Sequence, residues 1–344
     1  MSNAREKKKL LLLGSTGNLG QQTLEVLEKY NGQFEVVAIT GNKNEKLLRS
    51  QAKKLKIKNY ISTNSAAVLT KLVRATDADI IVNTLSGTVG VEPTKAALKA
   101  NKTLLLANKE ALVVAGEEIM KIPNAHKNII PLDSEHHAIY EVLKSHPNSE
   151  IEYIILPCSG GPFLGKKLKE LGNMTAADAL KHPRWNMGAK ITIESATLLN
   201  KGMEVIEAHH LFGLPLNKII VKIHPEAKIK GAVKFKDGKL LAYVSEKADM
   251  REHIEIALRQ VANLSSKNPS SKTFSTVNII SMDEAKLLAL PDPDHKTFPG
   301  IKIVVAAFKS GKNLKTFLKK EEALIDKFLK NKIKFGELLT LLSA

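Results

Sequence analysis

Cysteine is almost absent from this chain of 344 residues, since Cys158 is its only one. A single thiol excludes an internal disulfide framework and is typical of proteins of the reducing cytoplasm, where we expect this protein. Aromatic residues are also scarce, at 5% of the sequence. The chain therefore offers no series of aromatic rings among its basic residues on which nucleic-acid bases could stack.

Long hydrophobic runs are missing as well, because no stretch of about 18 apolar residues occurs, and a membrane-spanning helix is not expected. The first nine residues are mostly polar or charged, so we expect no secretory signal there. Lysine and arginine number 52 against 35 acidic residues, a formal net charge of +17. Such a charge attracts anions in general, including phosphorylated metabolites. Because the lysines are spread along the chain, we interpret most of them as a solvated surface and expect no nucleic-acid or membrane partner.

The segment from Lys9 to Gly20 reads KLLLLGSTGNLG, an apolar run that ends among glycines. An amphipathic segment, 21–29, follows it, and the pattern predicts a strand, a tight turn and a helix. Glycines in such a turn let the backbone approach a pyrophosphate at the helix N-terminus, where N–H groups and the helix dipole favour negative charge. The segment therefore predicts a dinucleotide site.

The next predicted strand, 34–40, leads to Asn42, Lys43 and Asn44. Enzymes that prefer the unphosphorylated nicotinamide cofactor usually carry an acid at this place for the ribose hydroxyls. This chain has no acid at the end of the strand and offers Lys43, a cation that suits a 2′-phosphate. We therefore predict NADPH as the cofactor.

Predicted strands and helices alternate as far as residue 132, and the strands are almost wholly apolar. This alternation predicts an α/β fold with a doubly wound, Rossmann-like parallel sheet. Ligands of such sheets bind beyond the carboxyl ends of the strands. Polar residues follow the predicted strands there, at 16–17, 43–44, 84–87, 108–110 and 133–135.

The pattern changes after residue 150. Strands are predicted at 152–156, 219–223, 232–235 and 240–244, with Asp237 and Gly238 as the turn of a hairpin. The tail from 301 to 342 is predicted to be helical. We expect an NADPH-binding domain at 1–132, an α+β catalytic domain at 133–264, a linker at 265–290 and a small helical C-terminal domain at 291–344.

Acidic residues at two places are candidate metal ligands. Asp133 and Glu135 are separated by one residue and could both reach a hard divalent ion, although a plain acidic N-cap explains them equally well. Glu204 lies in the predicted helix 194–210, on the same face as Asn200 and beside Lys201. A surface ion pair is the usual explanation of such a Lys–Glu pair. Gly202 favours a site, because a glycine inside a helix often marks a close approach.

Two loops of the second half could contact a ligand. Segment 157–163, PCSGGPF, offers backbone N–H groups and the hydroxyl of Ser159, although many such loops are only turns. Segment 182–188, HPRWNMG, holds the only tryptophan between proline and glycine. We interpret it either as core or as a mobile cover over a ligand.

Six motifs in this order resemble those of 1-deoxy-D-xylulose 5-phosphate reductoisomerases: GSTGNLG, LLANKE, PLDSEHHAI, SGGPF, HPRWNMGAKI and SATLLNKGME. The resemblance covers most of residues 9–300, and the last four motifs together are specific, because a generic dinucleotide fold does not require them. It implies rearrangement of 1-deoxy-D-xylulose 5-phosphate to an aldehyde and reduction by NADPH to 2-C-methyl-D-erythritol 4-phosphate, in the non-mevalonate route to isoprenoids. It also implies a homodimer.

The resemblance further implies roles for individual residues. Asp133, Glu135 and Glu204 would bind Mg²⁺ or Mn²⁺, which would polarise the substrate carbonyl. Contacts with the phosphorylated sugar are expected from Ser134, Ser159, His182, Trp185, Ser195, Asn200 and Lys201. Contacts with the cofactor are expected from Thr16, Gly17, Asn18, Leu19, Asn42, Lys43, Asn44, Asn108, Lys109, Glu110 and Gly188. The catalytic set is expected to be Asp133, Glu135, Glu204, His182 and Lys109.

The chain departs from the family pattern at several places. Asn18 replaces a serine of the glycine turn, and Gly-Arg-Lys becomes Gly188-Ala189-Lys190. The family's His-Pro-Gln-Ser, Pro-Asp-Met-Arg and Asn-Ala-Ala-Asn-Glu appear as residues 224–227, 248–251 and 317–321, which read HPEA, ADMR and FLKKE. We expect these changes to affect cofactor affinity and the packing of the tail more than the chemistry.

Two other functions fit parts of the sequence. Another NADP-linked dehydrogenase, such as a semialdehyde dehydrogenase, would need a reactive thiol, and Cys158 is the only candidate. A catalytically inactive relative could instead bind nucleic acid through its positive charge. The second alternative gives no reason to keep three carboxylates together with a phosphate-binding set.

Overall fold

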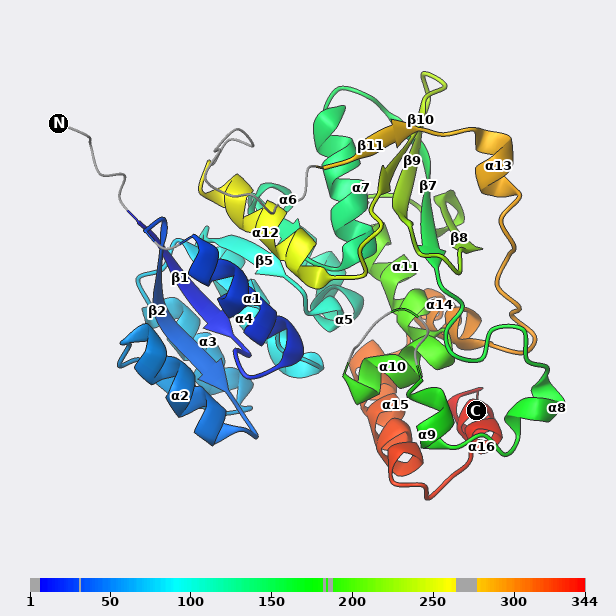
Figure 1. Cartoon of the computed structure of the whole chain (residues 1–344), viewed down its shortest axis with the longest axis horizontal. Helices are drawn as coiled ribbons and strands as arrows, with labels where there is room; N and C mark the ends of the chain where they lie inside the picture. Colours follow the sequence, from blue (N-terminus) through cyan, green and yellow to red (C-terminus); the bar gives the residue numbers. More distant parts are fainter. Residues whose placement is uncertain (1–6, 31, 182–183, 185–187, 264–276, 344) are drawn as a thin grey trace. The chain divides into compact units, whose positions relative to one another are not determined.

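The structure is a computed structural model, and it describes all residues except 1–6, 31, 182–183, 185–187, 264–276 and 344. The chain divides into two compact units, Met1–His137 with Asp249–Val277 and Ala138–Ala248 with Asn278–Ala344. Each unit contains its own β-sheet (Figure 1). Within the described ranges, no helix is both long and apolar enough to cross a membrane.

The first unit is built on a parallel sheet with the strand order β3-β2-β1-β4-β5-β6. Its strands are β1 (Lys8–Leu13), β2 (Phe34–Gly41), β3 (Tyr60–Ser62), β4 (Ile80–Asn83), β5 (Thr103–Leu106) and β6 (Ile129–Pro131). In the central strand β1, Leu10, Leu11, Leu12 and Leu13 are all fully buried. A strand covered on both faces is apolar on both faces, which is why the sequence shows continuous apolar runs here. The predicted doubly wound parallel sheet is confirmed.

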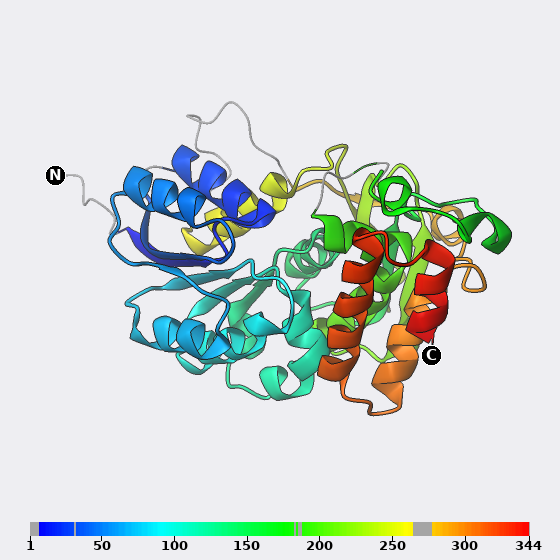
Figure 2. The ribbon, with the colours of Figure 1, turned by 90° about the horizontal axis from the view of Figure 1, so that it is seen from below.

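Helices cover both faces of this sheet. Figure 2 shows α1 (Asn18–Lys29), α2 (Glu45–Leu55) and α12 (Met250–Val261) on one face, and α3 (Ala66–Ala75), α4 (Val91–Lys99) and α5 (Lys109–Met120) on the other. The unit also contains the short helices η1 (Thr88–Gly90) and α6 (Ala125–Asn128). This arrangement leaves the carboxyl ends of the strands to the loops, where the predicted cofactor residues lie.

Helix α12 joins the first unit from a distant part of the sequence. The hydroxyl of Tyr30, the residue that follows α1, donates to Glu255 Oε1 at 2.6 Å, and Arg251 pairs with Glu25 of α1 at 2.8 Å. This helix was not predicted from the sequence, and it lies inside the range 133–264 that was expected to form one domain. An amphipathic pattern shows that a helix buries one face, but it does not show which sheet or helix covers that face.

The second unit is built on a mixed sheet with the order β11-β10-β9-β7-β8. Its strands are β7 (Ile151–Cys158), β8 (Ile219–Ile223), β9 (Ile229–Phe235), β10 (Leu240–Val244) and β11 (Ile279–Ser281). β7 is parallel to β8 and antiparallel to β9, and the hairpin predicted at Asp237 and Gly238 connects β9 with β10. Strand β11 lies in the range that was predicted to be a linker. Leu287 of α13 (Glu284–Leu288) packs on one face of this sheet, against Ile155 and Ala242.

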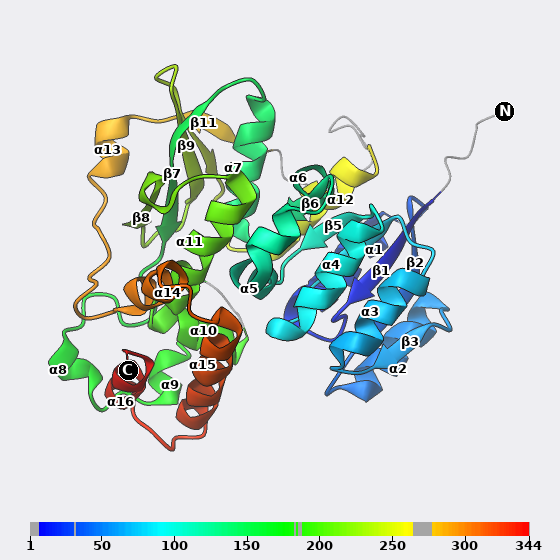
Figure 3. The ribbon, with the colours of Figure 1, turned by 180° about the vertical axis from the view of Figure 1, so that it is seen from behind.

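The second unit also contains helices, several of which pack on α10 and α11. Besides α13, they are α7 (Ser134–Ser145), which begins in the first unit, α8 (Leu168–Leu171), α9 (Ala176–Ala179), α10 (Ala189–Ala196), α11 (Leu199–Phe212), η2 (Leu216–Lys218), α14 (Gly300–Lys309), α15 (Leu314–Leu329) and α16 (Phe335–Ser343). Helix α14 packs on α11, and α15 packs on α10 and α16 (Figure 3). The helical tail predicted for 301–342 is confirmed.

The segment 194–210 was predicted to be one helix, and that prediction is wrong because the helix breaks. Helix α10 ends at Ala196 and α11 begins at Leu199, and the buried Leu198 between them has φ +60°. The left-handed region costs a leucine about 1–2 kcal/mol. The tertiary structure holds this break, because α14 approaches it so closely that a Cβ atom added to Gly300 would lie 2.3 Å from the Thr197 carbonyl oxygen. The close approach inferred at Gly202 is also that of α14, since an added Cβ would lie 3.0 Å from Ile301 Cα.

We predict that Gly300→Ala destabilises the second unit by about 1–3 kcal/mol, because the added methyl group meets backbone atoms that cannot move independently. Gly172→Ala is the matched control, since a Cβ there would meet nothing within 4 Å and its φ is −51°. The measurement is the free energy of unfolding in urea. Equal stability of the two variants would contradict the packing described for α14.

Candidate functional site

The glycine turn after β1 has a geometry that only glycine allows. Gly14 has φ +88°, and a Cβ atom added to Gly20 would lie 2.2 Å from the Gly14 carbonyl oxygen. The Ser15 N–H donates to the Thr40 carbonyl at 2.7 Å, which holds the turn against β2. Among the described residues, no side chain caps the start of α1, whose N-cap is Gly17. The start of this helix therefore fits the pyrophosphate of a dinucleotide.

The residues predicted to contact the far ribose lie beside this turn. A Cβ atom added to Gly41 would lie 2.9 Å from Thr16 Cγ2, so the turn and the end of β2 are in contact. Asn44 caps α2, because its side chain accepts a hydrogen bond from the Leu47 N–H at 3.0 Å. The side chain of Lys43 is exposed between these two structures. This position fits the contact with a 2′-phosphate expected from Lys43.

The LLANKE motif holds the ends of β4, β5 and β6 together. Asn108 Nδ2 donates to the carbonyls of Leu85 and Gly87, at 3.0 and 2.9 Å. Glu110 Oε1 accepts from the Gly87 N–H at 2.7 Å. Between these two residues, the largely buried Lys109 Nζ lies 2.6 Å from Asp133 Oδ2. Two residues of the predicted catalytic set, Lys109 and Asp133, thus form an ion pair within the first unit.

Asp133 and Glu135 form the acidic part of the first unit's site. Asp133 follows β6, and Glu135 lies in the first turn of α7, so both start from well-defined backbone. Carboxylate oxygens of the two residues lie within 4.8 Å of each other. The Ser134 hydroxyl donates to Glu135. Oxygen atoms at such a spacing fit a hard divalent cation, while Asp133 also occupies the position where an acidic N-cap is favourable.

In the second unit the structure brings the predicted phosphate-binding residues together. Lys201 Nζ donates to the Pro157 carbonyl at 2.8 Å and pairs with Glu204. Gly161, with φ +73°, packs so closely on α10 that an added Cβ atom would lie 2.8 Å from the Ser195 carbonyl oxygen. The loop that carries Ser159 therefore lies against both Ser195 and Lys201. We call Ser159, Ser195, Asn200 and Lys201 the phosphate set.

The expectation that Asn200, Lys201 and Glu204 lie together on one helix is confirmed. Asn200 Nδ2 donates to one carboxylate oxygen of Glu204, and Lys201 Nζ donates to the other. Lys201 is 3% exposed and Glu204 is 1% exposed, so this is no surface ion pair. Such burial requires the two charges to be paired.

The predicted site residues are divided between the two units. The cofactor residues of 16–19, 42–44 and 108–110 lie in the first unit with Asp133, Ser134 and Glu135, and the phosphate set lies in the second with Glu204. Gly188, the N-cap of α10, also belongs to the second unit. His182 and Trp185 lie outside the described residues.

Comparison with known proteins gives a consistent result. Models of 1-deoxy-D-xylulose 5-phosphate reductoisomerase match residues 10–72 and 61–116, and models of its C-terminal domains match 129–212 and 246–344. The chain belongs to this family. Reductoisomerases of Halothermothrix orenii and Caldanaerobacter subterraneus are 39% and 40% identical to it, over 96% of this chain and 89% and 90% of theirs.

Solved structures of reductoisomerases share the fold. One, from Zymomonas mobilis in complex with NADPH, has a TM-score of 0.80 with 30% identity, over 98% of this chain and 90% of that one. Another, in complex with NADPH, fosmidomycin and magnesium, has a TM-score of 0.81 with 30% identity, over 98% and 88%. The family membership identified from the six sequence motifs is confirmed.

In this member of the family, His224 lies next to the loop that carries Ser159, although the sequence analysis gave it no role. The backbone N–H of His224 donates to the Cys158 carbonyl at 2.7 Å, and its ring Nε2 accepts from the Lys228 backbone N–H at 3.2 Å. Burial lowers the pKa of His224, the carboxylate of Glu226 at 3.2 Å from Nδ1 opposes that shift, and nearby cations add to it, so that the net shift of the pKa is downward. The only signal in the sequence was the His-Pro dipeptide, which could not show that β7 and β8 end side by side.

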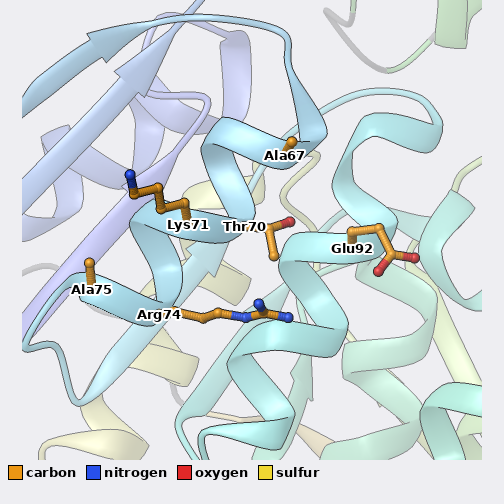
Figure 4. Close-up of a pocket in the computed structure, with 6 residues that line it drawn as sticks. All are labelled: Ala67, Thr70, Lys71, Arg74, Ala75 and Glu92. Carbon is orange, nitrogen blue, oxygen red and sulfur yellow. The ribbon is translucent and has the colours of Figure 1, made fainter.

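One pocket of the first unit lies away from all these residues. It is found between α3 and α4 and is lined by Ala67, Thr70, Lys71, Arg74, Ala75 and Glu92 (Figure 4). Its charged residues are exposed and of both signs. None of them belongs to a predicted site, and the pocket is not part of the candidate site.

The lowered pKa of His224 predicts how stability depends on pH. A histidine whose pKa is lowered by folding stabilises the folded state most above the ordinary value of 6.5, and this contribution is lost as the pH falls below it. We therefore expect His224→Asn to lose less stability than the parent chain between pH 7.5 and 5.5, measured by urea unfolding. The exposed His126→Gln is the control and should behave as the parent does. A parallel decline of His224→Asn and the parent would contradict the prediction.

Proposed function

We propose that this chain uses NADPH and a divalent metal ion to convert 1-deoxy-D-xylulose 5-phosphate to 2-C-methyl-D-erythritol 4-phosphate, a step towards isoprenoid precursors. The observation that carries the proposal is the phosphate set, where one ammonium group, two hydroxyl-bearing residues and an amide gather at one loop and two helix ends. A dinucleotide fold by itself does not need such a set. Because the chain belongs to the reductoisomerase family, we propose that this set binds the phosphate group of 1-deoxy-D-xylulose 5-phosphate.

NADPH is proposed as the cofactor on two grounds. Solved relatives were obtained in complex with NADPH. In this chain the glycine turn and the start of α1 fit a pyrophosphate, and Lys43 is placed beside the turn for a 2′-phosphate. Asn108 and Glu110 act through the loop after β4, which they hold in place. We propose that Thr16, Gly17, Asn18 and Leu19 contact the pyrophosphate side, that Lys109 and Glu110 lie near the nicotinamide side, and that Gly188 also contacts the cofactor.

We propose that Asp133, Glu135 and Glu204 bind Mg²⁺, the ion found in solved relatives, and that Mn²⁺ serves as well. When bound, the metal would polarise the substrate carbonyl as a Lewis acid. The acidic and hydroxyl oxygens of 133–135 suit a hard cation. Lys109 orients Asp133 through their ion pair, and Ser134 stands beside Glu135 for the substrate.

Binding of the phosphate group can supply the energy for covering the reacting carbons. We propose that Lys201 and Asn200, in the first turn of α11, donate to this phosphate group together with Ser159 of the loop and Ser195 near the end of α10. We propose that the loop of His182 and Trp185, which runs into Gly188 and α10, closes over the substrate and excludes water. A reactive aldehyde would otherwise escape.

Several finer proposals rest on the family and on composition. We propose that the chain works as a homodimer in the cytoplasm, with the phosphorylated sugar as its partner and without nucleic-acid or membrane partners. We propose that residues 1–132 form the NADPH-binding domain, 133–264 the catalytic domain and 291–344 the C-terminal domain, with a linker at 265–290. A thiol-dependent dehydrogenase and an inactive basic binding protein are not favoured for a member of this family.

The direct test is NADPH oxidation in the presence of 1-deoxy-D-xylulose 5-phosphate and Mg²⁺ or Mn²⁺. We expect turnover that disappears when the metal is chelated, and a loss of at least about 100-fold in kcat for Glu204→Gln, because a proposed ligand charge is removed. Glu117→Gln, at an exposed ion pair, is the control and should be fully active. Cys158→Ala should also be active, and its inactivity would instead favour the thiol mechanism. Turnover that persists without metal would argue against the proposal.

The role of Lys43 is tested by the choice of cofactor. Lys43→Ala should raise the KM for NADPH about tenfold, the equivalent of about 1.4 kcal/mol, because a charged contact with the 2′-phosphate is lost. The KM for NADH should not change, since NADH has no phosphate there. Lys46→Ala, three residues further and equally exposed, is the control. A rise in the KM for both NADPH and NADH would show that Lys43 does not recognise the 2′-phosphate.

A further inference from the structure

A charged cluster lies between α10 and α15, in the interior of the second unit. Glu321 of α15 is 1% exposed, and one of its carboxylate oxygens lies 3.5 Å from Lys190 Nζ on α10. Lys190 also donates to Glu194, one turn further along α10, whose side chain is 4% exposed. We call Lys190, Glu194 and Glu321 the α10–α15 ion cluster. It differs from the exposed ion pairs elsewhere on the chain, because both of its carboxylates are buried and only Lys190, whose side chain is 25% exposed, reaches towards solvent.

Stability alone does not account for this cluster. The other buried positions of α15 are apolar, namely Leu314, Leu318, Leu324, Ile325 and Phe328. A carboxylate at the remaining buried position has to be desolvated, and apolar residues of similar volume usually stabilise a core at least as well. What the cluster adds is a preferred spacing of the two helices, because the attraction between Glu321 and Lys190, 3.5 Å apart, weakens as the charges separate. Glu321 thus specifies where α10 lies on α15.

Helix α10 carries part of the phosphate set. Ser195 directly follows Glu194 of the cluster, and α10 ends one residue later, before the left-handed Leu198 and the first turn of α11. Gly161 packs on the Ser195 carbonyl with no room for a Cβ atom, so a shift of α10 would also move the loop of Ser159. A displacement of α10 at Lys190 would therefore shift Ser195, the loop of Ser159 and the start of α11, and with them every residue of the phosphate set.

A second set of contacts connects α15, through α16, with the loop that carries Ser159. The ring of Phe163, at the end of the Ser159 loop, lies 4.6 Å from that of Phe335 on α16, which in turn lies 5.7 Å from Phe328 on α15. Helix α15 therefore supports the loop through aromatic packing and supports α10 through Glu321. These two supports are independent, one apolar and one ionic.

We propose that Glu321 is a positioning residue of the phosphate site, which acts through Lys190 and Glu194 to hold Ser195 against the Ser159 loop. The inference rests on the proposed function, since it assigns phosphate binding to this set. Glu321 touches neither substrate nor cofactor in this proposal. Its removal changes the affinity for the phosphate group, and not the chemistry at the other end of the substrate.

The test compares Glu321→Gln with Glu322→Gln in the full chain. Glu322 is the next residue of α15 and is exposed, so it is a matched control. Binding of inorganic phosphate is measured by calorimetry, and KM and kcat are measured with 1-deoxy-D-xylulose 5-phosphate. For Glu321→Gln we expect the Kd for phosphate and the KM for substrate to rise at least about fivefold, with kcat within about twofold, and the Kd for NADPH to rise much less than that for phosphate, because α10 offers the cofactor only Gly188. Glu322→Gln should match the parent chain in all four quantities.

A purely structural role would give a different result. A lower melting temperature with unchanged phosphate affinity would overturn the proposal, and so would an equal loss of phosphate and NADPH binding. If Glu321→Gln does not fold, Glu321→Asp and Lys190→Arg keep the charges while moving them, and they should weaken phosphate binding more than NADPH binding. Unchanged phosphate affinity in both would also overturn it.

Failure of the proposed function can be distinguished from failure of this inference. A parent chain that binds inorganic phosphate but does not turn over the substrate would contradict the proposed reaction. The comparison of Glu321→Gln with Glu322→Gln would still decide the role of Glu321. A parent chain that does not bind phosphate would overturn the inference.

Discussion

Charged side chains that leave water must find opposite charges or hydrogen-bond partners, because the desolvation of one ion costs several kcal/mol. The candidate site of this chain is built from groups under that constraint. In the first unit Lys109 pairs with Asp133, with side chains 8% and 12% exposed. In the second, Lys201 is held by Glu204 and by the Pro157 carbonyl, and Lys190 by Glu194 and Glu321. Each pairing ties together segments that are distant in sequence or lie in different turns.

The rest of the structure serves to place these groups accurately. The parallel sheet brings the ends of β5 and β6 side by side, which sets Lys109 opposite Asp133. The mixed sheet brings the end of β7 to the first turn of α11, and the tight crossing of α14 forces the break at Leu198 that starts α11 there. Close packing transmits small shifts, so helices remote from the ligand can affect its binding.

Much of the candidate site was predictable from local patterns. Glycine spacing and apolar runs predicted the turn at Gly14, the strands, and the place of Lys43 and Asn44 after the second strand. The family motifs identified the phosphate set. Helix α12 and Glu321 were not predictable in the same way. A buried glutamate on a lysine-rich amphipathic helix reads as one more solvated charge, because its partner Lys190 lies 131 positions earlier in the chain.

Residue types and their spacing were enough to predict the alternation of strands and helices, the glycine turn, the candidate oxygen ligands and phosphate donors, and the family. These depend on interactions between near neighbours, or on motifs that are read directly from residue types. Only the tertiary structure decided that the helix 194–210 is broken, that α12 packs on α1, and that Glu321 faces Lys190. Each depends on which surfaces meet across long separations, and local periodicity carries no information about that choice.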